Sequence, residues 1–187
     1  MKGEKQHVVI IGAGFAGLFA AKAFFGKNVR VTLIDKNNYH TFNPLLYQVG
    51  AALIEPDQIA YPVRSFIRKK NNIDFLMADV IDIKFKKNTV VTSRGEIPYD
   101  YLIIGCGSVS AFFGVKGADK YSLTLKNLDD ALNLRNHVLV NFEKASWCDN
   151  EEERKRCLNF VIIGGGPTGV EFAGALAEFV QGPLRKD

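Results

Sequence analysis

Apolar runs alternate along this chain with glycine-rich and small-residue stretches, and one arrangement of them occurs twice. Residues 7–11 and 160–163 are mostly β-branched or otherwise apolar, and each run leads directly into a cluster of glycines. Such runs are typical of strands that are buried on both faces of a sheet. The small-residue stretches after the glycines predict helices over 15–26 and 170–180. The pattern therefore predicts the same strand, turn and helix at both places.

Three further segments predict strands in the first part of the chain. Residues 29–34 are largely apolar and end at Asp35, which completes a strand-helix-strand unit with parallel strands. Residues 101–104 predict a fully apolar strand followed by a glycine-containing segment. From 73 to 98, short β-rich runs separated by polar breaks predict an antiparallel meander. The meander runs are residues 75–77, 80–85 and 89–92.

The remaining segments connect or extend these strands. Residues 37–64 contain three prolines and predict an irregular connection, with one helix near 62–70. A connection of this length usually has a function. Residues 127–147 have apolar side chains at helical spacing, and residues 149–156 predict a charged linker. We therefore expect a second unit to begin near residue 158.

Composition places the chain among ordinary globular proteins. Of its 187 residues, 47% are hydrophobic and 24% are charged, which excludes the disordered and fibrous classes. The net charge of +4 comes from acidic and basic residues that are interspersed along the chain. No basic stretch is interleaved with aromatic residues as in a nucleic-acid-binding surface, so we expect no nucleic-acid partner. Glycines interrupt the nearly uncharged residues 8–25, which argues against a signal peptide or a membrane span there.

Cysteine and histidine usage argues against a metal centre. The three cysteines are odd in number, and none of them forms a Cys-x-x-Cys pair. No spacing of His, Cys, Asp and Glu residues matches a metal site. A reducing, cytoplasmic setting fits this usage best.

The first glycine cluster has the spacing of a dinucleotide-binding turn. Gly12 permits a tight turn, Gly14 lets a pyrophosphate approach the backbone, and Gly17 lets the helix pack close to its strand. The start of the helix offers N–H groups and a positive dipole end to phosphates. Asp35 is placed to accept hydrogen bonds from an adenosine ribose and disfavours a 2′-phosphate. This first glycine motif reads Gly12-Ala13-Gly14-Phe15-Ala16-Gly17.

The second glycine cluster repeats that spacing. Glu171 follows it and is expected on the first turn of the helix, where it either gains from the helix dipole or faces a nicotinamide or flavin. The acid that would distinguish NADH from NADPH is expected beyond residue 187, so that choice stays open. Two dinucleotide motifs in one chain point to a flavoprotein that also binds a nicotinamide. This second glycine motif reads Gly164-Gly165-Gly166-Pro167-Thr168-Gly169.

Four segments together resemble the type II NADH dehydrogenases, which are single-subunit NADH:quinone oxidoreductases. The resemblance covers essentially the whole chain, and residues 42–49 and the Thr-Gly-Val-Glu ending are its more specific parts. It implies an α/β fold with a Rossmann-like FAD-binding domain, a parallel sheet with helices plus an antiparallel meander, followed by the first strand and helix of a second Rossmann-like domain. The segments are residues 12–18, 42–49, 99–108 and 164–171.

The resemblance also implies a domain division at residue 157. Residues 1–157 would be the N-terminal part of the FAD-binding domain, and residues 158–187 the start of a truncated NAD(H)-binding domain. One strand and one helix cannot bury a sheet face or form a dinucleotide crevice. We therefore expect the chain to be a fragment of a longer protein and inactive by itself.

FAD is implied at the first glycine motif, with Gly12 to Ala16 on the pyrophosphate. By the resemblance, Asp35 and Lys36 would lie around the adenosine, and the backbone of Val80 would meet the adenine. The residues along the flavin would be His40, Asn43, Pro44, Leu45 and Gln48. The segment that would close over FAD comprises Cys106, Gly107 and Ser108. The family usually has a threonine where this chain has Cys106, which puts a side-chain hydroxyl contact in doubt.

NADH is implied at the second glycine motif, and a quinone as the electron acceptor. Glu171 would be the acid between nicotinamide, flavin and the quinone side. Peripheral contact with the inner face of the cytoplasmic membrane would come from segments after residue 187, and a homodimer is compatible with the resemblance. The nicotinamide contacts would be made by Gly164, Gly166, Thr168 and Gly169.

Other flavoprotein classes fit less well or stay open. A disulfide reductase needs a Cys-x-x-x-x-Cys dithiol soon after the first glycine motif, whereas no cysteine precedes Cys106. Sulfide:quinone oxidoreductases use separated cysteines such as Cys148 and Cys157 but need no nicotinamide site, so the intact second motif argues against them. A reductase with another acceptor and an FAD-binding module without turnover both remain open.

Overall fold

The structure is a computed structural model that describes residues 5–182. Within this range the chain divides into two compact units. The sheet unit comprises residues 5–41 and 60–108, and the helical unit comprises residues 42–59 and 109–182. Each unit is described by itself.

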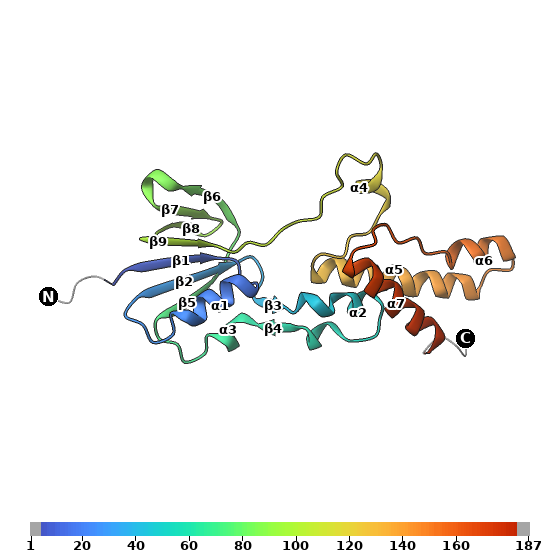
Figure 1. The fold of residues 1–187 in the computed structure, drawn as a ribbon, viewed down its shortest axis with the longest axis horizontal. Helices are drawn as coiled ribbons and strands as arrows, with labels where there is room; N and C mark the ends of the chain where they lie inside the picture. Colours follow the sequence, from blue (N-terminus) through green and yellow to red (C-terminus); the bar gives the residue numbers. More distant parts are fainter. Residues whose placement is uncertain (1–4, 183–187) are drawn as a thin grey trace. The chain divides into compact units, whose positions relative to one another are not determined.

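A four-stranded parallel sheet is the centre of the sheet unit (Figure 1). Its strands are β1 (His7–Ile11), β2 (Arg30–Asp35), β5 (Ile73–Met77) and β9 (Tyr101–Ile104), in the order β5-β2-β1-β9. All three neighbouring pairs are parallel. The predicted α/β class and the strand-helix-strand unit at the start of the chain are therefore confirmed.

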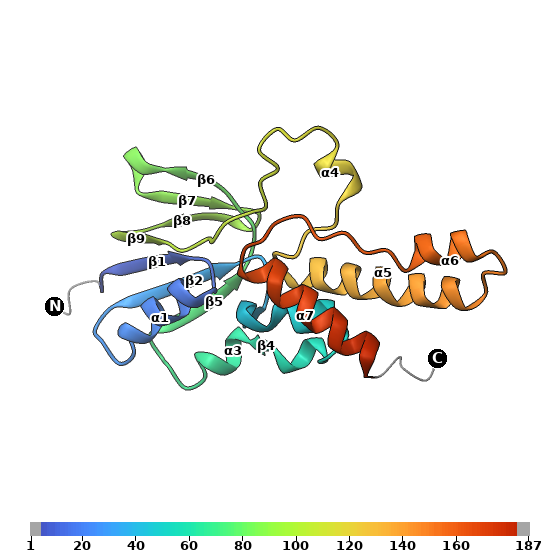
Figure 2. The same cartoon turned by 45° about the vertical axis from the view of Figure 1, so that its right-hand side comes forward.

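Both faces of this sheet are covered, which explains why its strands are continuously apolar rather than alternating. Val8 and Ile10 of β1 belong to a buried cluster with Leu18 of helix α1 (Phe15–Ala23). The intervening residues of β1, Val9 and Ile11, belong to a cluster on the other face. That second cluster includes residues of the three-stranded antiparallel meander β6 (Val80–Lys84), β7 (Thr89–Thr92) and β8 (Gly95–Pro98). Figure 2 shows α1 and the meander on opposite sides of the sheet.

The structure corrects several predicted boundaries in the sheet unit. Residues 75–77 belong to β5 in the parallel sheet and not to the meander, because Ile73 and Phe75 are buried against α1 and β5 pairs with β2. The first helix ends at Ala23 instead of residue 26. There the Phe24 N–H donates to the Ala21 carbonyl oxygen and the Phe25 N–H to the Lys22 carbonyl oxygen, each at 3.1 Å and each three residues back. Helix α3 (Val63–Phe66) is shorter than predicted. A short antiparallel pair, β3 (Tyr39–Thr41) and β4 (Ala60–Pro62), and a 3-10 turn, η3 (Phe85–Lys87), were not predicted.

The helical unit is organised around α5 (Leu128–Ser146), as the apolar spacing predicts. Asn127 caps it by accepting a hydrogen bond from the Asp130 N–H at 2.9 Å. Ala131, Val138 and Ala145 are buried at seven-residue intervals and give α5 one continuous packing face. The other elements are η1 (Asn43–Leu45), α2 (Leu46–Gly50), η2 (Pro56–Gln58), α4 (Ala118–Tyr121), α6 (Glu151–Cys157) and α7 (Pro167–Gln181).

The predicted charged linker at 149–156 is wrong, because the structure has helix α6 there. Three glutamates occupy its first turn and three basic residues its last turn, which is the charge order that the helix dipole favours. Asn150 caps the helix by accepting the Glu152 N–H at 2.8 Å. Lys155 pairs with Glu151 at 2.7 Å across one helical turn.

The predicted strand at 160–163 is also wrong, because the described residues of the helical unit contain no strand. Val161 is 79% exposed and Ile163 is 81% exposed. A strand exists only where a neighbouring strand satisfies its backbone groups. An apolar run without such a neighbour stays extended and solvent-exposed.

The domain boundary at residue 157 remains a prediction. The structure places residues 109–182 in the same compact unit as residues 42–59. In this unit Phe172, Ala175 and Leu176 of α7 pack with Ala51 and Val138 instead of against a sheet.

Across residues 5–182, no helix combines the length and the hydropathy needed to cross a membrane. The same residues contain no cluster of three or more His, Cys, Asp and Glu side chains that could hold a metal ion.

His7 gives the sheet unit a predictable response to pH. Its Nε2 lies 2.8 Å from the Thr32 Oγ1. Burial, and then the Arg30 guanidinium, hold the pKa of His7 below its ordinary value of 6.5. The unfolded chain therefore binds this proton at a higher pH than the folded chain does, so acid favours unfolding. We expect the His7 contribution to be fully present above about pH 6.5 and to be lost as the pH falls through the lower folded-state pKa.

Urea unfolding of wild type and His7→Gln at about pH 7.5 and about pH 5.5 measures this effect. The free energy of unfolding should fall more between the two pH values in wild type than in His7→Gln. Equal falls in the two proteins would contradict the assignment.

Candidate functional site

The first glycine motif forms a closed turn between β1 and α1. Gly12 has φ +97°, a left-handed conformation that side chains disfavour. A Cβ on Gly17 would lie 1.7 Å from the Gly12 carbonyl oxygen, so only glycine allows the helix to pack this close. At Gly14 a Cβ would meet no atom within 4 Å. The turn therefore needs Gly12 and Gly17 for its own structure, whereas Gly14 leaves open space beside the backbone.

The start of α1 is suited to an anion. Gly14 is its N-cap residue, and within the described residues no side chain caps this helix end. Its first turn contains no acidic residue. The first N–H groups of a helix lack intrahelical partners and carry the positive end of the helix dipole. Open space at Gly14 and a helix start without acids together fit a pyrophosphate group.

Asp35 and His40 hold the peptide groups of Ala13 from two sides. The Ala13 N–H donates to Asp35 Oδ2 at 2.6 Å, and the Ala13 carbonyl oxygen lies 3.0 Å from His40 Nδ1. A carbonyl only accepts, so His40 Nδ1 carries the proton in this contact. The Phe15 ring meets the His40 ring edge to face, with centroids 4.8 Å apart. The structure therefore brings together four residues predicted for the site: Ala13 after β1, Phe15 at the start of α1, Asp35 at the end of β2 and His40 of β3.

The second oxygen of Asp35 is also engaged. Asp35 Oδ1 accepts a hydrogen bond from the Asn37 N–H at 2.8 Å. A carboxylate oxygen has more than one acceptor position, so both oxygens retain capacity for ribose hydroxyls. Asp35 thus stabilises the turn itself, a role that the sequence did not predict.

The end of β9 lies against the first glycine motif. The Gly105 N–H donates to the Ile11 carbonyl oxygen at 2.7 Å. A Cβ on Gly12 would lie 2.3 Å from the Gly105 carbonyl oxygen and 3.1 Å from Cys106 Cα. The carboxyl ends of neighbouring parallel strands thus meet where ligands bind in open α/β sheets. Cys106, Gly107 and Ser108 follow directly and are exposed.

Gly105 is a site residue that sequence reasoning missed. A Cβ there would lie 3.3 Å from both the Gly17 nitrogen and the Ile11 carbonyl oxygen. Its position directly after an apolar strand was the available indication, because a small residue there lets two strand ends approach each other.

Other predicted FAD residues are located less directly. Lys36 is exposed beside Asp35, and the Val80 side chain packs with the cluster between the sheet and the meander. The residues predicted along the flavin after His40 belong to the helical unit, so their contact with FAD stays a prediction. They are Asn43, Pro44, Leu45 and Gln48.

The second glycine motif has the same local turn as the first. Gly164 has φ +114°, and a Cβ on Gly169 would lie 2.2 Å from the Gly164 carbonyl oxygen. A Cβ on Gly166 would meet nothing within 4 Å, as at Gly14. Helix α7 starts at Pro167, with no acid in its first turn, and the exposed Thr168 follows. The turn forms although no strand precedes it, so its geometry is encoded locally.

Glu171 lies one turn later than predicted. Because α7 starts at Pro167, Glu171 is in the second turn of the helix rather than the first. The helix dipole acts mainly within the first turn, so it gives Glu171 little stabilisation. The Glu171 side chain is exposed, whereas its neighbour Phe172 is buried. Stabilisation by the helix dipole therefore accounts poorly for an acid at position 171.

Comparison with known proteins identifies similar chains. The family described as pyridine nucleotide-disulphide oxidoreductase matches residues 6–182. The chain is 40% identical over 186 residues to the type II NADH:quinone oxidoreductase NdhA of Mycobacterium tuberculosis, with 97% of this chain and 40% of that protein covered. It is 36% identical to the mitochondrial external alternative NADH-ubiquinone oxidoreductase of Yarrowia lipolytica, with 98% of this chain and 34% of that protein covered.

A solved structure agrees with these relatives. NDH2 from Plasmodium falciparum, solved in complex with NADH, has a TM-score of 0.89 and 32% identity to this chain. The match covers 98% of this chain and 39% of that structure. The resemblance to type II NADH dehydrogenases is thereby confirmed, and the chain spans about 40% of the length of NdhA, the first of these relatives.

Proposed function

Since this chain belongs to the pyridine nucleotide-disulphide oxidoreductase family, we propose that it forms part of an FAD-dependent NADH:quinone oxidoreductase. The observation that carries this proposal is the pair of glycine motifs, whose turns share two features. The first glycine of each motif is left-handed, and the last glycine lies so close to the carbonyl oxygen of the first that a Cβ would collide with it. One motif serves the flavin and the other the nicotinamide that reduces it. The names of its relatives support NADH as the donor and a quinone as the acceptor.

FAD fits the first glycine motif. The open space at Gly14 and the start of α1 hold the pyrophosphate, and Asp35 accepts hydrogen bonds from the ribose while keeping the turn closed. Lys36 lies beside the adenosine and the Val80 backbone beside the adenine. When bound, FAD accepts reducing equivalents from NADH and passes them to the quinone.

The remaining predicted residues position the isoalloxazine end. His40 orients the Ala13 peptide, and Cys106, Gly107 and Ser108 present backbone groups from the end of β9. From the resemblance alone, we propose that four residues of η1 and α2 also lie along the flavin: Asn43, Pro44, Leu45 and Gln48.

NADH fits the second glycine motif. Gly164 and Gly169 close the turn, Gly166 leaves space for the pyrophosphate, and Thr168 stands on the first turn of α7. Residues 161–163 are exposed, and residues 160–163 have no partner strand among residues 5–182, so the crevice for the rest of NADH is incomplete here. We therefore infer that the 187-residue chain does not turn over by itself. Because quinones are lipid-soluble, we propose that the working protein lies peripherally at a membrane, and we assign it to the inner face of the cytoplasmic membrane.

Glu171 is proposed to hold a proton at its carboxylate between the nicotinamide and the quinone side. Glu171→Gln keeps the shape of the side chain and removes its basicity, so NADH-dependent quinone reduction should slow by about 100-fold. Glu178→Gln, seven residues later on the same helix and also exposed, is the matched control and should stay within about twofold of wild type. Unchanged turnover in Glu171→Gln would remove this role.

The proposed function is tested by steady-state assays of the protein extended to the length of its relatives. We expect NADH oxidation coupled to a soluble quinone analogue. Turnover only with ferricyanide or another non-quinone acceptor would identify a reductase of a different kind. Bound flavin without any NADH oxidation would identify an FAD-binding module.

A further inference from the structure

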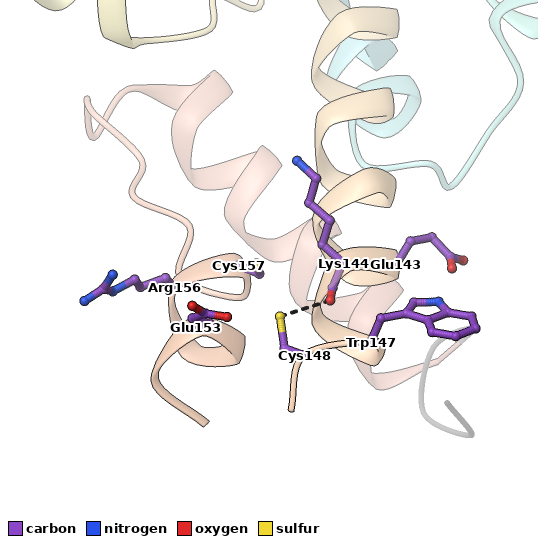
Figure 3. Close-up of a pocket in the computed structure, with 7 residues that line it drawn as sticks. All are labelled: Glu143, Lys144, Trp147, Cys148, Glu153, Arg156 and Cys157. Carbon is purple, nitrogen blue, oxygen red and sulfur yellow. Dashed lines mark hydrogen bonds between the residues drawn. The ribbon is translucent and has the colours of Figure 1, made fainter. Parts of the chain in front are cut away.

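Two cysteines that the proposed function does not use face each other in the helical unit. Cys148 directly follows the α5 C-cap residue Trp147, and Cys157 is the last residue of α6. Both side chains line one pocket of about 640 Å³ between the end of α5 and α6. Figure 3 shows both residues there, together with Glu153 and Arg156 of α6. Both thiols are free and half-buried.

The backbone around these cysteines holds them in place. The Arg154 guanidinium donates to the Cys148 carbonyl oxygen at 2.9 Å, which ties the connection back to α6. Asn150 caps α6 at its other end. Glu153 and Cys157, four residues apart, lie on one face of α6 and both line the pocket. The two thiols therefore approach each other from fixed backbone positions.

The Cys148 thiol is held in its protonated form. Its Sγ donates to the Lys144 carbonyl oxygen at 3.1 Å, drawn as a dashed line in Figure 3. Desolvation in the pocket, and then the charge and hydrogen bond of the adjacent Cys157 thiol, raise the pKa of Cys148. Because a thiolate is the reactive form, the raised pKa disfavours Cys148 as the attacking thiol at neutral pH.

We propose that Cys148 and Cys157 are a redox modification site, at which a peroxide converts the two thiols into a reversible disulfide that closes the α5–α6 hairpin. The Cys157 thiolate attacks one peroxide oxygen, so an S–O bond forms, the O–O bond breaks and hydroxide leaves. Cys148 then attacks the sulfenic sulfur of Cys157; the S–S bond forms, the S–O bond breaks, and the oxygen leaves as water with the Cys148 proton. Two thiols and one hydrogen peroxide thus give one disulfide and two waters.

The third cysteine provides an internal control. Cys106 is exposed and belongs to the sheet unit, whereas the pair belongs to the helical unit. A peroxide reacting with any exposed thiol would modify Cys106 first. A reaction that depends on the pair leaves Cys106 reduced and consumes the other two thiols together.

Treatment of the chain with hydrogen peroxide, followed by non-reducing tryptic mass spectrometry, tests the proposal. Trypsin cuts after Lys144, Arg154 and Arg156, so the two cysteines fall in different peptides and a disulfide joins those peptides. We expect the free thiols to fall from three to one, with the joined peptides as product and full reversal by a phosphine reductant. Cys106→Ser should still form the link.

Other outcomes would overturn the proposal. These are overoxidation of Cys157 without a link, links through Cys106, or links between two chains. Cys148→Ser and Cys157→Ser should each abolish the joined peptides. The mapping in wild type decides the question even where a serine variant folds poorly, because it needs no variant.

Discussion

Gly17→Ala is expected to unfold the sheet unit, whereas Gly14→Ala, three residues earlier, should fold normally and lose FAD. The alanine Cβ at position 17 would lie 1.7 Å from the Gly12 carbonyl oxygen. That oxygen belongs to backbone in the middle of the closed turn, so no side-chain movement relieves the collision. We expect a loss of about 3 kcal/mol or more in the free energy of unfolding.

At position 14 the added Cβ meets no protein atom within 4 Å, and the backbone there has φ −72°, which alanine adopts readily. The free energy of unfolding should change by less than about 1 kcal/mol, the cost of alanine at a helix N-cap. The same Cβ occupies the space assigned to the pyrophosphate. The affinity for FAD should therefore fall by more than about tenfold, or about 1.4 kcal/mol.

Urea unfolding followed by circular dichroism, and FAD titration followed by flavin fluorescence, measure the two effects separately. Wild type and the two variants form one series. If Gly14→Ala lost stability, or bound FAD like wild type, the assignment of the open space to the pyrophosphate would be wrong. If Gly17→Ala kept wild-type stability, the turn would not be closed as described.

Asp35→Ala is expected to destabilise the sheet unit as well as weaken FAD binding. The Ala13 N–H donates to this carboxylate at 2.6 Å, and Ala13 itself is 1% exposed. Removing the acceptor leaves a buried N–H without its partner, which costs about 2–3 kcal/mol for a hydrogen bond to a charged group. The Asn37 N–H also loses its acceptor, although water replaces it more easily.

Asp35→Asn separates the two roles of the carboxylate. The asparagine carbonyl oxygen can still accept the Ala13 N–H, so about half of the lost stability should return. The amide nitrogen would face the second backbone N–H as a donor, so the ribose and Asn37 contacts should not recover. Lys36→Ala is the control, since Lys36 is exposed and its removal should change the free energy of unfolding by less than about 0.5 kcal/mol. Equal stability of Asp35→Ala and wild type would contradict the role of the carboxylate in the turn.

The sequence predicted those features that depend on neighbours close in the chain. The prediction of a tight turn at the first glycine motif is confirmed, because the left-handed Gly12 and the close contact at Gly17 are requirements of the turn itself. The second motif shows the same dependence, since its turn forms without a preceding strand. Helix α5 was predicted nearly to its ends because its apolar spacing and its Asn127 cap agree.

The predicted elements that are wrong depend on partners distant in the chain or on the order of charges. Residues 160–163 have strand-like side chains, but pairing strands for them are absent from residues 5–182. Residues 75–77 could pair on either sheet by composition alone, and only the register with β2 decides. The many charges of residues 149–156 predict a linker, whereas their order, acids before bases, favours a helix.

In the candidate site, several contacts depend on how elements far apart in the sequence meet. Asp35 was assigned to the ribose, but its bonds to Ala13 and Asn37 depend on how the end of β2 meets the turn. Glu171 was placed one turn too early because the first residue of α7 could not be located from spacing. Gly105 was missed because its close neighbours, Ile11 and Gly17, belong to elements far from it in the sequence.

The measurement that tests the central claim most directly is the anaerobic absorbance of the flavin in the protein extended to the length of its relatives. The claim is that the first glycine motif holds FAD and the second holds the NADH that reduces it. Addition of NADH should bleach the flavin band, and a soluble quinone analogue should restore it. A flavin band that stays unchanged after saturating NADH would contradict the claim.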